Sequence, residues 1–251
     1  MKTYNRIFWS LGLVALLGAT VSGCKDFLDR KPLTATLEDL NQGSLEAQSF
    51  ALYSTLRTYA GFSSLPWLDF HSIRDDDAQK GSSATDGAEI NTEFETFQYT
   101  KDDWATDTYW NDHFYMINLA NQELHIADSL KVSDEASLRN VGEALFFRAY
   151  SYFELVKAYG DVPLLNFYST SAKDNIKPKS PATEIYQLID SDLNAASNLL
   201  PVNWVDASTG NNKYPGRVTS GTAKSLWAQT YLFRSNWTRV VELCNEVIGS
   251  N

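Results

Sequence analysis

The chain has 251 residues, of which 43% are hydrophobic, and this length suits one large domain or a domain and a half. Its formal net charge of −10 argues against a nucleic-acid partner, and against electrostatic attachment to anionic lipid, because like charges repel. Its two cysteines are too few for a framework of disulfide bonds.

Residues 1–23 have the pattern of a cleaved signal peptide. Two basic residues precede an apolar run over residues 7–21, which is about as long as a signal-peptide core and short for a membrane-spanning helix. The run ends in Val21-Ser22-Gly23-Cys24, which resembles a bacterial lipobox. We therefore expect cleavage before Cys24 and diacylation of its thiol. An ordinary secretory signal with a chance cysteine and a transmembrane anchor are the two alternatives.

Residues 24–43 are predicted to be a lipidated tether, and residues 44–251 the folded part of the chain. Five of the eight residues from Lys25 to Pro32 are charged, so this stretch is expected to be extended. In the folded part, the apolar spacing predicts a first helix over 44–60, with Ser44 as its N-cap. Residues 61–106 show no sustained periodicity, and such a long irregular stretch is uncommon unless it is functional.

Two long helices are predicted next, over residues 107–130 and 133–159. The first has one polar member in its apolar stripe, Asn121, and a buried amide there needs a hydrogen-bond partner. Ser133 is a possible N-cap of the second helix, and Gly160 fits a left-handed C-terminal position. The stripes are Trp110, Phe114, Ile117, Asn121 and Leu124 in the first helix, and Leu138, Val141, Leu145, Ala149, Tyr152 and Val156 in the second.

Three further helices complete an all-α prediction, since no segment alternates at period two. One begins at Ser180-Pro181 and ends before Pro201, and two more, over 220–234 and from 237, are joined so tightly that they must pack antiparallel. Cys244 lies in the apolar stripe of the last helix and is expected to be buried and inert. A lone hairpin cannot bury its own face, so we expect a fragment of a longer protein, or an end that is unstable or covered by another chain.

Several spaced segments, taken together and in order, resemble one known family. The strongest runs from Glu143 to Leu155 as EALFFRAYSYFEL and continues into YGDVPL at 159–164. The others are Phe27-Leu28-Asp29, the segment from Trp110 to Asn121, the segment from Ile185 to Pro201, and the segment from Gly216 to Leu232. This combination is similar to the SusD/RagB-like outer-membrane lipoproteins.

The resemblance implies a fold of tetratricopeptide-like helical hairpins with long loop insertions. It also implies a surface-exposed lipoprotein in the outer membrane that captures oligosaccharides, or sometimes peptides, and hands them to a SusC-type TonB-dependent transporter. Family members are usually about twice this long, and their C-terminal half, which normally supplies much of the ligand face, has no counterpart here.

The densest polar cluster, residues 74–81, is the candidate ligand site. Carboxylates accept hydrogen bonds from sugar hydroxyls and an arginine donates a rigid fork, while tryptophan faces stack on sugar rings. The candidate ligand contacts are Trp67, Arg74, Asp76 and Trp104. The alternative is a solvated loop in which the aspartates cap turns.

Other patterns are weak. Asp75, Asp77 and Gln79 nearly fit a calcium loop, but Lys80 stands where glycine is required. The segment 216–221 has the outer spacing of a P-loop, but Thr222 replaces its lysine, and helix capping by Thr219 or Ser220 explains it better.

The histidines, His71, His113 and His125, have no metal-ligand spacing, and the last two are expected on helix surfaces. Arg148 and Glu154 are interpreted as structural residues that hold helices together. We predict no metal, no cofactor and no catalytic residue.

The sequence thus favours a non-enzymatic, lipid-anchored protein that binds oligosaccharides. The alternatives are a helical-repeat scaffold lipoprotein for peptides or proteins and a surface glycoside hydrolase.

Overall fold

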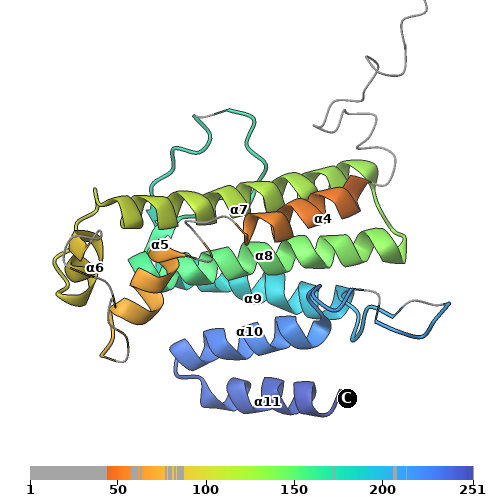
Figure 1. Ribbon diagram of the computed structural model, residues 1–251. Helices are drawn as coiled ribbons and strands as arrows, with labels where there is room; N and C mark the ends of the chain where they lie inside the picture. The colour runs from red at the N-terminus through yellow and green to blue at the C-terminus, as the bar shows by residue number, and fades with distance from the viewer. Residues whose placement is uncertain are drawn as a thin grey trace, which may run out of the picture. The chain divides into compact units, whose positions relative to one another are not determined.

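The computed structural model describes residues 44–57, 62, 64–76, 78, 81, 83, 88–171, 173–205, 208–212 and 214–250, and the predicted signal peptide, tether and Cys24 lie outside these residues. Figure 1 shows that the described part is helical, which confirms the all-α prediction. The helices are α4 (Ser44–Thr55), α5 (Leu65–Leu68), the π-helical turn η1 (Asp69–Ile73), α6 (Ala88–Glu95), α7 (Trp104–Leu130), α8 (Glu135–Tyr159), α9 (Ala182–Leu199), α10 (Ser220–Phe233) and α11 (Trp237–Ile248). The short strands β1 (Val162–Pro163) and β2 (Lys179–Ser180) pair antiparallel.

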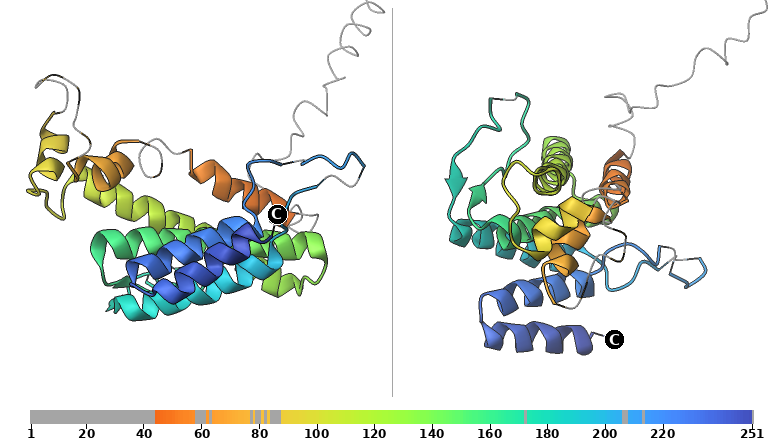
Figure 2. Two further views of the ribbon diagram at one scale, coloured as in Figure 1. Left: turned by 90° about the horizontal axis from the view of Figure 1, so that it is seen from below. Right: turned by 60° about the vertical axis from the view of Figure 1, so that its left-hand side comes forward.

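Helix α8 lies at the centre of this arrangement. It packs between α7 and α9, α4 lies against α7 and α8, and α10 and α11 continue the row on the far side of α9 (Figures 1 and 2). A side chain at Gly142 would place its Cβ 3.0 Å from Leu200 Cγ, so the glycine is what allows α8 and the end of α9 to approach closely. Most of α8 is therefore buried on every side.

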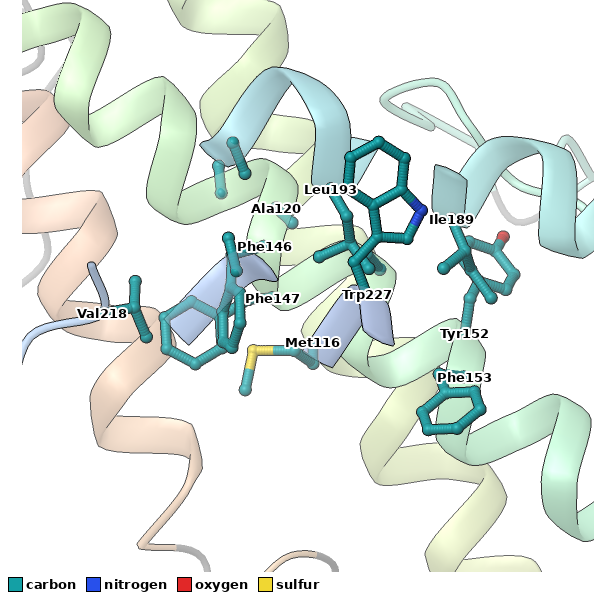
Figure 3. Close-up of a cluster of buried hydrophobic side chains, with 14 of the residues drawn as sticks. Met116, Ala120, Phe146, Phe147, Tyr152, Phe153, Ile189, Leu193, Val218 and Trp227 are labelled. Carbon is teal, nitrogen blue, oxygen red and sulfur yellow. The ribbon is translucent and has the colours of Figure 1, made fainter. Parts of the chain in front are cut away.

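The main core lies between α7, α8, α9 and α10, and the aromatic side chains labelled in Figure 3 come from α8 and α10. Large planar rings fill the space between helices and supply most of the buried apolar area. Buried members include Met116, Ala120, Phe146, Phe147, Tyr152, Phe153, Ile189, Leu193, Val218 and Trp227. A separate small cluster of Ile73, Phe94 and Ala105, with Phe70 and Tyr99 packed against it, fastens η1 and α6 to the start of α7.

The helix ends confirm some of the predicted caps and correct others. Thr219 caps α10 through a reciprocal hydrogen-bonded pair with Thr222, as expected. Gly160 follows α8 with a φ of 74°, as expected. The predicted N-cap Ser133 is wrong, because the Asp134 carboxylate accepts the hydrogen bond from Ser137 N at 2.9 Å. Ser180 belongs to β2, and Pro181 is the residue before α9.

The segment predicted to be irregular, residues 61–106, contains three short helical elements, α5, η1 and α6. Each has only 4, 5 or 8 residues, which is too short to show a periodic pattern in the sequence. Contacts with α7 and with one another hold them, rather than intrinsic helix propensity. The first helix is also shorter than predicted, since α4 ends at Thr55.

Two predictions of burial were wrong. His113 is fully buried, with its ring 4.5 Å from Phe62 and 4.4 Å from Tyr109, because α5 and the residues before it cover that face of α7. Burial lowers the pKa of His113 to about 3, so the ring is neutral. Cys244 is exposed, because Leu243 is the residue of α11 that turns into the core.

Candidate ligand-binding site

A cavity of about 310 Å³ lies where the short helical elements meet the C-terminal half of α8. Residues from η1 and the turn that follows it, α7, α8 and α10 form its walls, together with Phe97 after α6. The lining residues are Phe70, His71, Arg74, Asp75, Phe97, Tyr109, Glu154, Lys157, Ala158 and Phe233. Charged groups and aromatic rings therefore share one concave surface, which is typical of a ligand site.

Glu154 is the buried acid at the back of this cavity. Its carboxylate accepts from Tyr109 Oη at 2.7 Å and pairs with His71 Nε2 at 2.8 Å and Lys157 Nζ at 2.7 Å. Burial alone would raise the pKa of Glu154, but the hydrogen bonds and charges of His71 and Lys157 outweigh burial and lower it to about 2. Glu154 is thus ionised, and both of its oxygens are occupied.

Arg74 lies over aromatic rings rather than beside a carboxylate. Its guanidinium carbon is 5.7 Å from the ring centre of Phe70, 5.9 Å from that of Phe97 and 5.5 Å from that of Tyr99. Such distances allow cation–π attraction, which holds the positive charge without neutralising it. Within the part of the chain that the structure describes, no carboxylate pairs with Arg74.

Phe97 is an exposed aromatic residue in a strained backbone conformation. Its φ is 57° and 61% of its surface is exposed. A bulky residue in the left-handed region is uncommon, and strain of this kind is concentrated at functional sites. The conformation keeps the Phe97 ring at the mouth of the cavity and over Arg74.

The structure places the four predicted ligand residues differently. Arg74 lines the cavity, whereas Trp67 of α5 is not a lining residue but stacks on His71, which is one, with ring centres 4.8 Å apart. Asp76 is exposed in the turn that follows, and Trp104, the first residue of α7, is 46% exposed and is not among the lining residues. Of the four predicted residues, Arg74 alone lines the cavity, and Trp67 contacts a lining residue, His71.

Sequence reasoning missed His71, Phe97, Lys157 and Phe233 as lining residues. The three-residue spacing of Glu154 and Lys157 was a usable signal, since it places the two on one face of α8. Nothing in the sequence around Phe97 indicated its role, because its positive φ follows from the packing around it.

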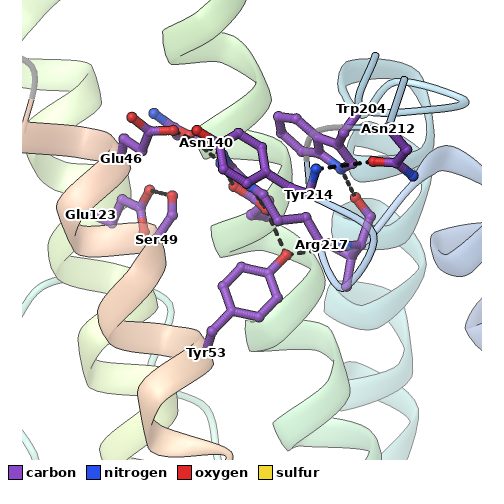
Figure 4. Close-up of polar contacts among 11 residues, drawn as sticks. Glu46, Ser49, Tyr53, Glu123, Asn140, Trp204, Asn212, Tyr214 and Arg217 are labelled. Carbon is purple, nitrogen blue, oxygen red and sulfur yellow. Dashed lines mark hydrogen bonds and ion pairs between the residues drawn. The ribbon is translucent and has the colours of Figure 1, made fainter. Parts of the chain in front are cut away.

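A second polar cluster, at the N-terminal end of α8, has the opposite character (Figure 4). Arg217 pairs with both oxygens of Glu143 through Nε and Nη2, and its Nη1 donates to Glu46 Oε1 at 2.9 Å. Its guanidinium carbon is 3.9 Å from the ring centre of Trp204. Tyr53 Oη donates to Glu143 Oε1 at 2.6 Å and accepts from the backbone of residue 218. This cluster ties α4, α8 and the loop before α10 together.

Glu123 lies close to this cluster and is fully buried. It accepts a hydrogen bond from Ser49 Oγ at 2.6 Å, but burial raises its pKa to about 8. Because its side chain does not reach solvent, we interpret Glu123 as a structural group.

Arg148 is also a structural residue, as the sequence predicted. It makes two hydrogen bonds of 2.8 Å to Asp192 of α9 and one of 2.8 Å to Asn121 Oδ1 of α7. Asn121 Nδ2 donates in turn to Leu165 O at 2.8 Å, which confirms that this amide is satisfied. Glu154 likewise links α8 to α7 through Tyr109, so both of the predicted structural residues join helices.

Among the described residues, no group of three His, Cys, Asp or Glu side chains is arranged to hold a metal ion. Asp77 and Gln79 of the near-calcium pattern lie outside those residues. His125 is exposed and stacks on Tyr168, as expected for a surface residue. Of the helices that the structure describes, none has the length and apolar character needed to span a membrane.

A smaller and more apolar cavity, of about 210 Å³, lies between α7 and the loop before β2. Trp110, Phe114 and Phe167 supply its aromatic walls. The amide of Asn121, which also lines it, is already engaged by Arg148 and Leu165. This cavity offers fewer charged donors than the one at Arg74.

The sequence over residues 26–232 matches the SusD-like family described as "Starch-binding associating with outer membrane". A "SusD-like protein" of Bacteroides ovatus is 27% identical over 92% of this chain and 41% of its own length, and "SusD-like protein P2" of Formosa agariphila is 25% identical over 100% and 47%.

Among solved structures, a "Laminarin binding SusD-like protein" is 25% identical with a TM-score of 0.69, covering 82% of this chain and 43% of the other. A SusD-like protein from Bacteroides fragilis, also 25% identical, has a TM-score of 0.70 over 87% of this chain and 40% of its own. The chain thus spans less than half the length of each of these relatives. By sequence and by fold, it belongs to the SusD-like family.

Proposed function

We propose that this protein binds oligosaccharides in the Arg74 cavity and delivers them to a SusC-type TonB-dependent transporter in the outer membrane. The observation that carries the proposal is the cavity itself, in which the donors Arg74 and Lys157 stand beside the exposed rings of Phe97 and Phe233. Donors of this kind bind sugar hydroxyls, and aromatic faces cover the apolar face of a sugar ring. The laminarin-binding relative supports a glycan as the ligand class.

Binding without hydrolysis fits the state of Glu154. A glycosidase needs a carboxylic acid whose pKa is raised so that it can donate a proton, together with a second carboxylate. The pKa of Glu154 is instead lowered to about 2, and both oxygens are engaged by His71, Tyr109 and Lys157. Glu123 does have a raised pKa, but it is fully buried and out of reach of a ligand.

Titration calorimetry with laminarin and malto-oligosaccharides tests the proposal. We expect binding without product release, and an affinity about tenfold lower in Phe97→Ala, because truncating a central aromatic contact commonly costs this much. Phe167→Ala is the matched control, since Phe167 lines the smaller cavity. Equal affinity in Phe97→Ala and the unaltered protein, with both folded, would exclude this cavity as the site.

Trp67, Asp76 and Trp104 remain proposed ligand contacts. Trp67→Ala is expected to act through His71, on which it stacks, and so to weaken binding less than Phe97→Ala does. Trp104→Ala and Asp76→Asn are each expected to weaken binding only for ligands long enough to extend beyond the cavity. A length series of oligosaccharides separates these cases.

The lipid anchor is the second part of the proposal. Residues 1–23 are removed as a signal peptide, Cys24 is acylated, and residues 24–43 tether residues 44–251 to the membrane surface. A tether raises the effective concentration of the protein near its transporter, so weak contacts suffice for transfer. Radiolabelled palmitate is expected in the wild type and not in Cys24→Ser, and a label retained by Cys24→Ser would contradict the assignment.

A scaffold for peptides or proteins is a second candidate, and the exposed face of α11 favours it. Trp237, Val241 and Ile248 are 61, 59 and 72% exposed, which is more apolar exposure than a short surface helix usually carries. Failure of every glycan to bind would favour this candidate.

A further inference from the structure

We infer that the cavity selects acidic sugars, in which a carboxylate or sulfate group pairs with Arg74. The inference rests on the proposed function and names its ligand class more narrowly. It depends on how the charges of the cavity are paired: the cation Arg74 has no acidic partner among the described residues, whereas the buried acid Glu154 is paired with His71 and Lys157.

Arg74 is the cation whose charge is not compensated. Its guanidinium has five N–H donors in a planar fork that matches the two oxygens of a carboxylate. Phe70, Phe97 and Tyr99 contact it through their rings and supply no acceptor for those donors. No other described side chain pairs with it, so the fork is free for an anion.

The buried acid of the cavity, Glu154, is compensated by its neighbours. Glu154 is 5% exposed and its oxygens are held by Lys157, His71 and Tyr109. Because Lys157 lies 2.7 Å from Glu154, the buried carboxylate does not present an unshielded negative charge to an incoming ligand. The pairing therefore shields the buried acid of the cavity, which leaves Asp75 as its other acidic lining residue.

The two exposed acids nearest Arg74 in the chain are Asp75, which also lines the cavity, and Asp76. Both are exposed to solvent, where water and salt screen their charge far more than the interior screens Glu154. The net charge of −10 is spread over the whole chain, and salt screens it beyond about 8 Å at physiological ionic strength. Local pairing with Arg74 thus decides the selectivity.

Phe97 supplies the surface on which an acidic sugar ring would lie. It is 61% exposed, and its ring centre is 5.9 Å from the guanidinium carbon of Arg74. A ring placed on this face brings its charged substituent within reach of Arg74. The cavity thus fits a sugar with one apolar face and one anionic group better than it fits a neutral sugar.

Calorimetry with three oligosaccharides of equal length tests the inference: an oligogalacturonate, a sulfated galactan oligomer and neutral laminarihexaose. We expect at least one acidic ligand to bind about tenfold or more tightly than the neutral one, because hydrogen bonds between charged groups are the stronger kind. Which acidic ligand binds more tightly identifies the carboxylate or the sulfate as the group recognised.

Arg74→Gln is expected to weaken binding of the acidic ligand about tenfold more than binding of the neutral one, and so to abolish this preference, since the amide still donates to hydroxyls but carries no charge. The charge-matched control is Lys173→Gln, which removes an exposed cation away from the cavity and is expected to leave the preference intact. Equal affinity for all three ligands, or a preference that survives Arg74→Gln, would overturn the inference and leave the proposed function standing. If none of the three bound, both would fail.

Discussion

The two ends of α8 use arginine in opposite ways. At the N-terminal end, Arg217 lies over a tryptophan ring and also satisfies its donors with Glu143 and Glu46. At the C-terminal end, Arg74 lies over three rings and finds no acid among the described residues. The aromatic contacts are alike, so the presence or absence of an acceptor is what separates an arginine that holds the fold from one that is ready for a ligand.

The largest expected effect is from Arg217→Ala. It leaves Glu143, which is fully buried, with the Tyr53 hydroxyl but without its cationic partner, so we expect the free energy of unfolding to fall by about 3–5 kcal/mol. Urea denaturation followed by circular dichroism measures this change.

Arg239→Ala is the matched control, because Arg239 also contacts an aromatic ring and a carboxylate, but at the surface. Its loss is expected to cost about 1 kcal/mol or less. Equal losses in both variants would mean that the burial of Glu143 does not increase the cost of losing its arginine partner.

Glu123→Gln is expected to change how stability depends on pH. The pKa of Glu123 is about 8 in the folded protein and near 4.5 when unfolded, so between these values the folded state holds a proton that the unfolded state lacks. Its contribution to stability is therefore full below pH 4.5 and is lost as the pH rises, by on the order of 1 kcal/mol per pH unit.

Because Gln does not titrate, the stability of Glu123→Gln compared with that of the unaltered protein should be higher at pH 8 than at pH 5. Melting temperatures at the two pH values give the comparison. Glu154→Gln is the opposite case, since the pKa of Glu154 is lowered to about 2 and its contribution is lost as the pH falls from about 4.5 towards 2. Parallel pH profiles for both variants would contradict these assignments.

Gly142→Ala tests how closely the N-terminal half of α8 is packed. The added Cβ meets Leu200 Cγ at 3.0 Å, so we expect a loss of about 1–3 kcal/mol from overpacking. Gly221→Ala in α10 is the control, because its nearest neighbour is 3.7 Å away, and there the substitution should stabilise by about 0.5–1 kcal/mol. No change in stability for Gly142→Ala would show that the end of α9 can move to make room for the added Cβ.

Phe97→Gly should have the smallest effect on stability and a large effect on binding. Glycine relieves the strain of a positive φ in the folded state, but it also raises the conformational entropy of the unfolded chain. These two effects oppose each other, so we expect a net change in the free energy of unfolding below about 1 kcal/mol. Affinity for the oligosaccharide should nevertheless fall about tenfold, because the ring is lost. A stability loss of several kcal/mol would identify Phe97 as a packing residue instead.

The fold was predictable where a helix is long and buried along a clear stripe. The approximate ranges of α7, α8 and α9, the need of Asn121 for a hydrogen-bond partner and a cap at Thr219 or Ser220 all follow from local pattern and capping chemistry. His113 and Cys244 were misplaced, because segments distant in the sequence decide which helix faces are covered. The resemblance to a known family identified the architecture more fully than periodicity alone.

The candidate site was predictable only in part. The polar cluster at residues 74–81 directed attention to Arg74, which lines the cavity, but the choice of Trp104 as a platform was guided by residue type alone. Phe97 was missed because a positive φ at a phenylalanine follows from tertiary packing. Glu154 was interpreted only as structural, and its partner Lys157 was missed although the two lie three residues apart.

The small cluster of Ile73, Phe94 and Ala105 is separate from the main core. Residues that it supports, such as Arg74 and Phe97, can therefore vary without disturbing the long helices, whose stability comes from other contacts. A protein built in this way could acquire new ligand preferences through changes in one short stretch of chain, while its scaffold accumulated few substitutions.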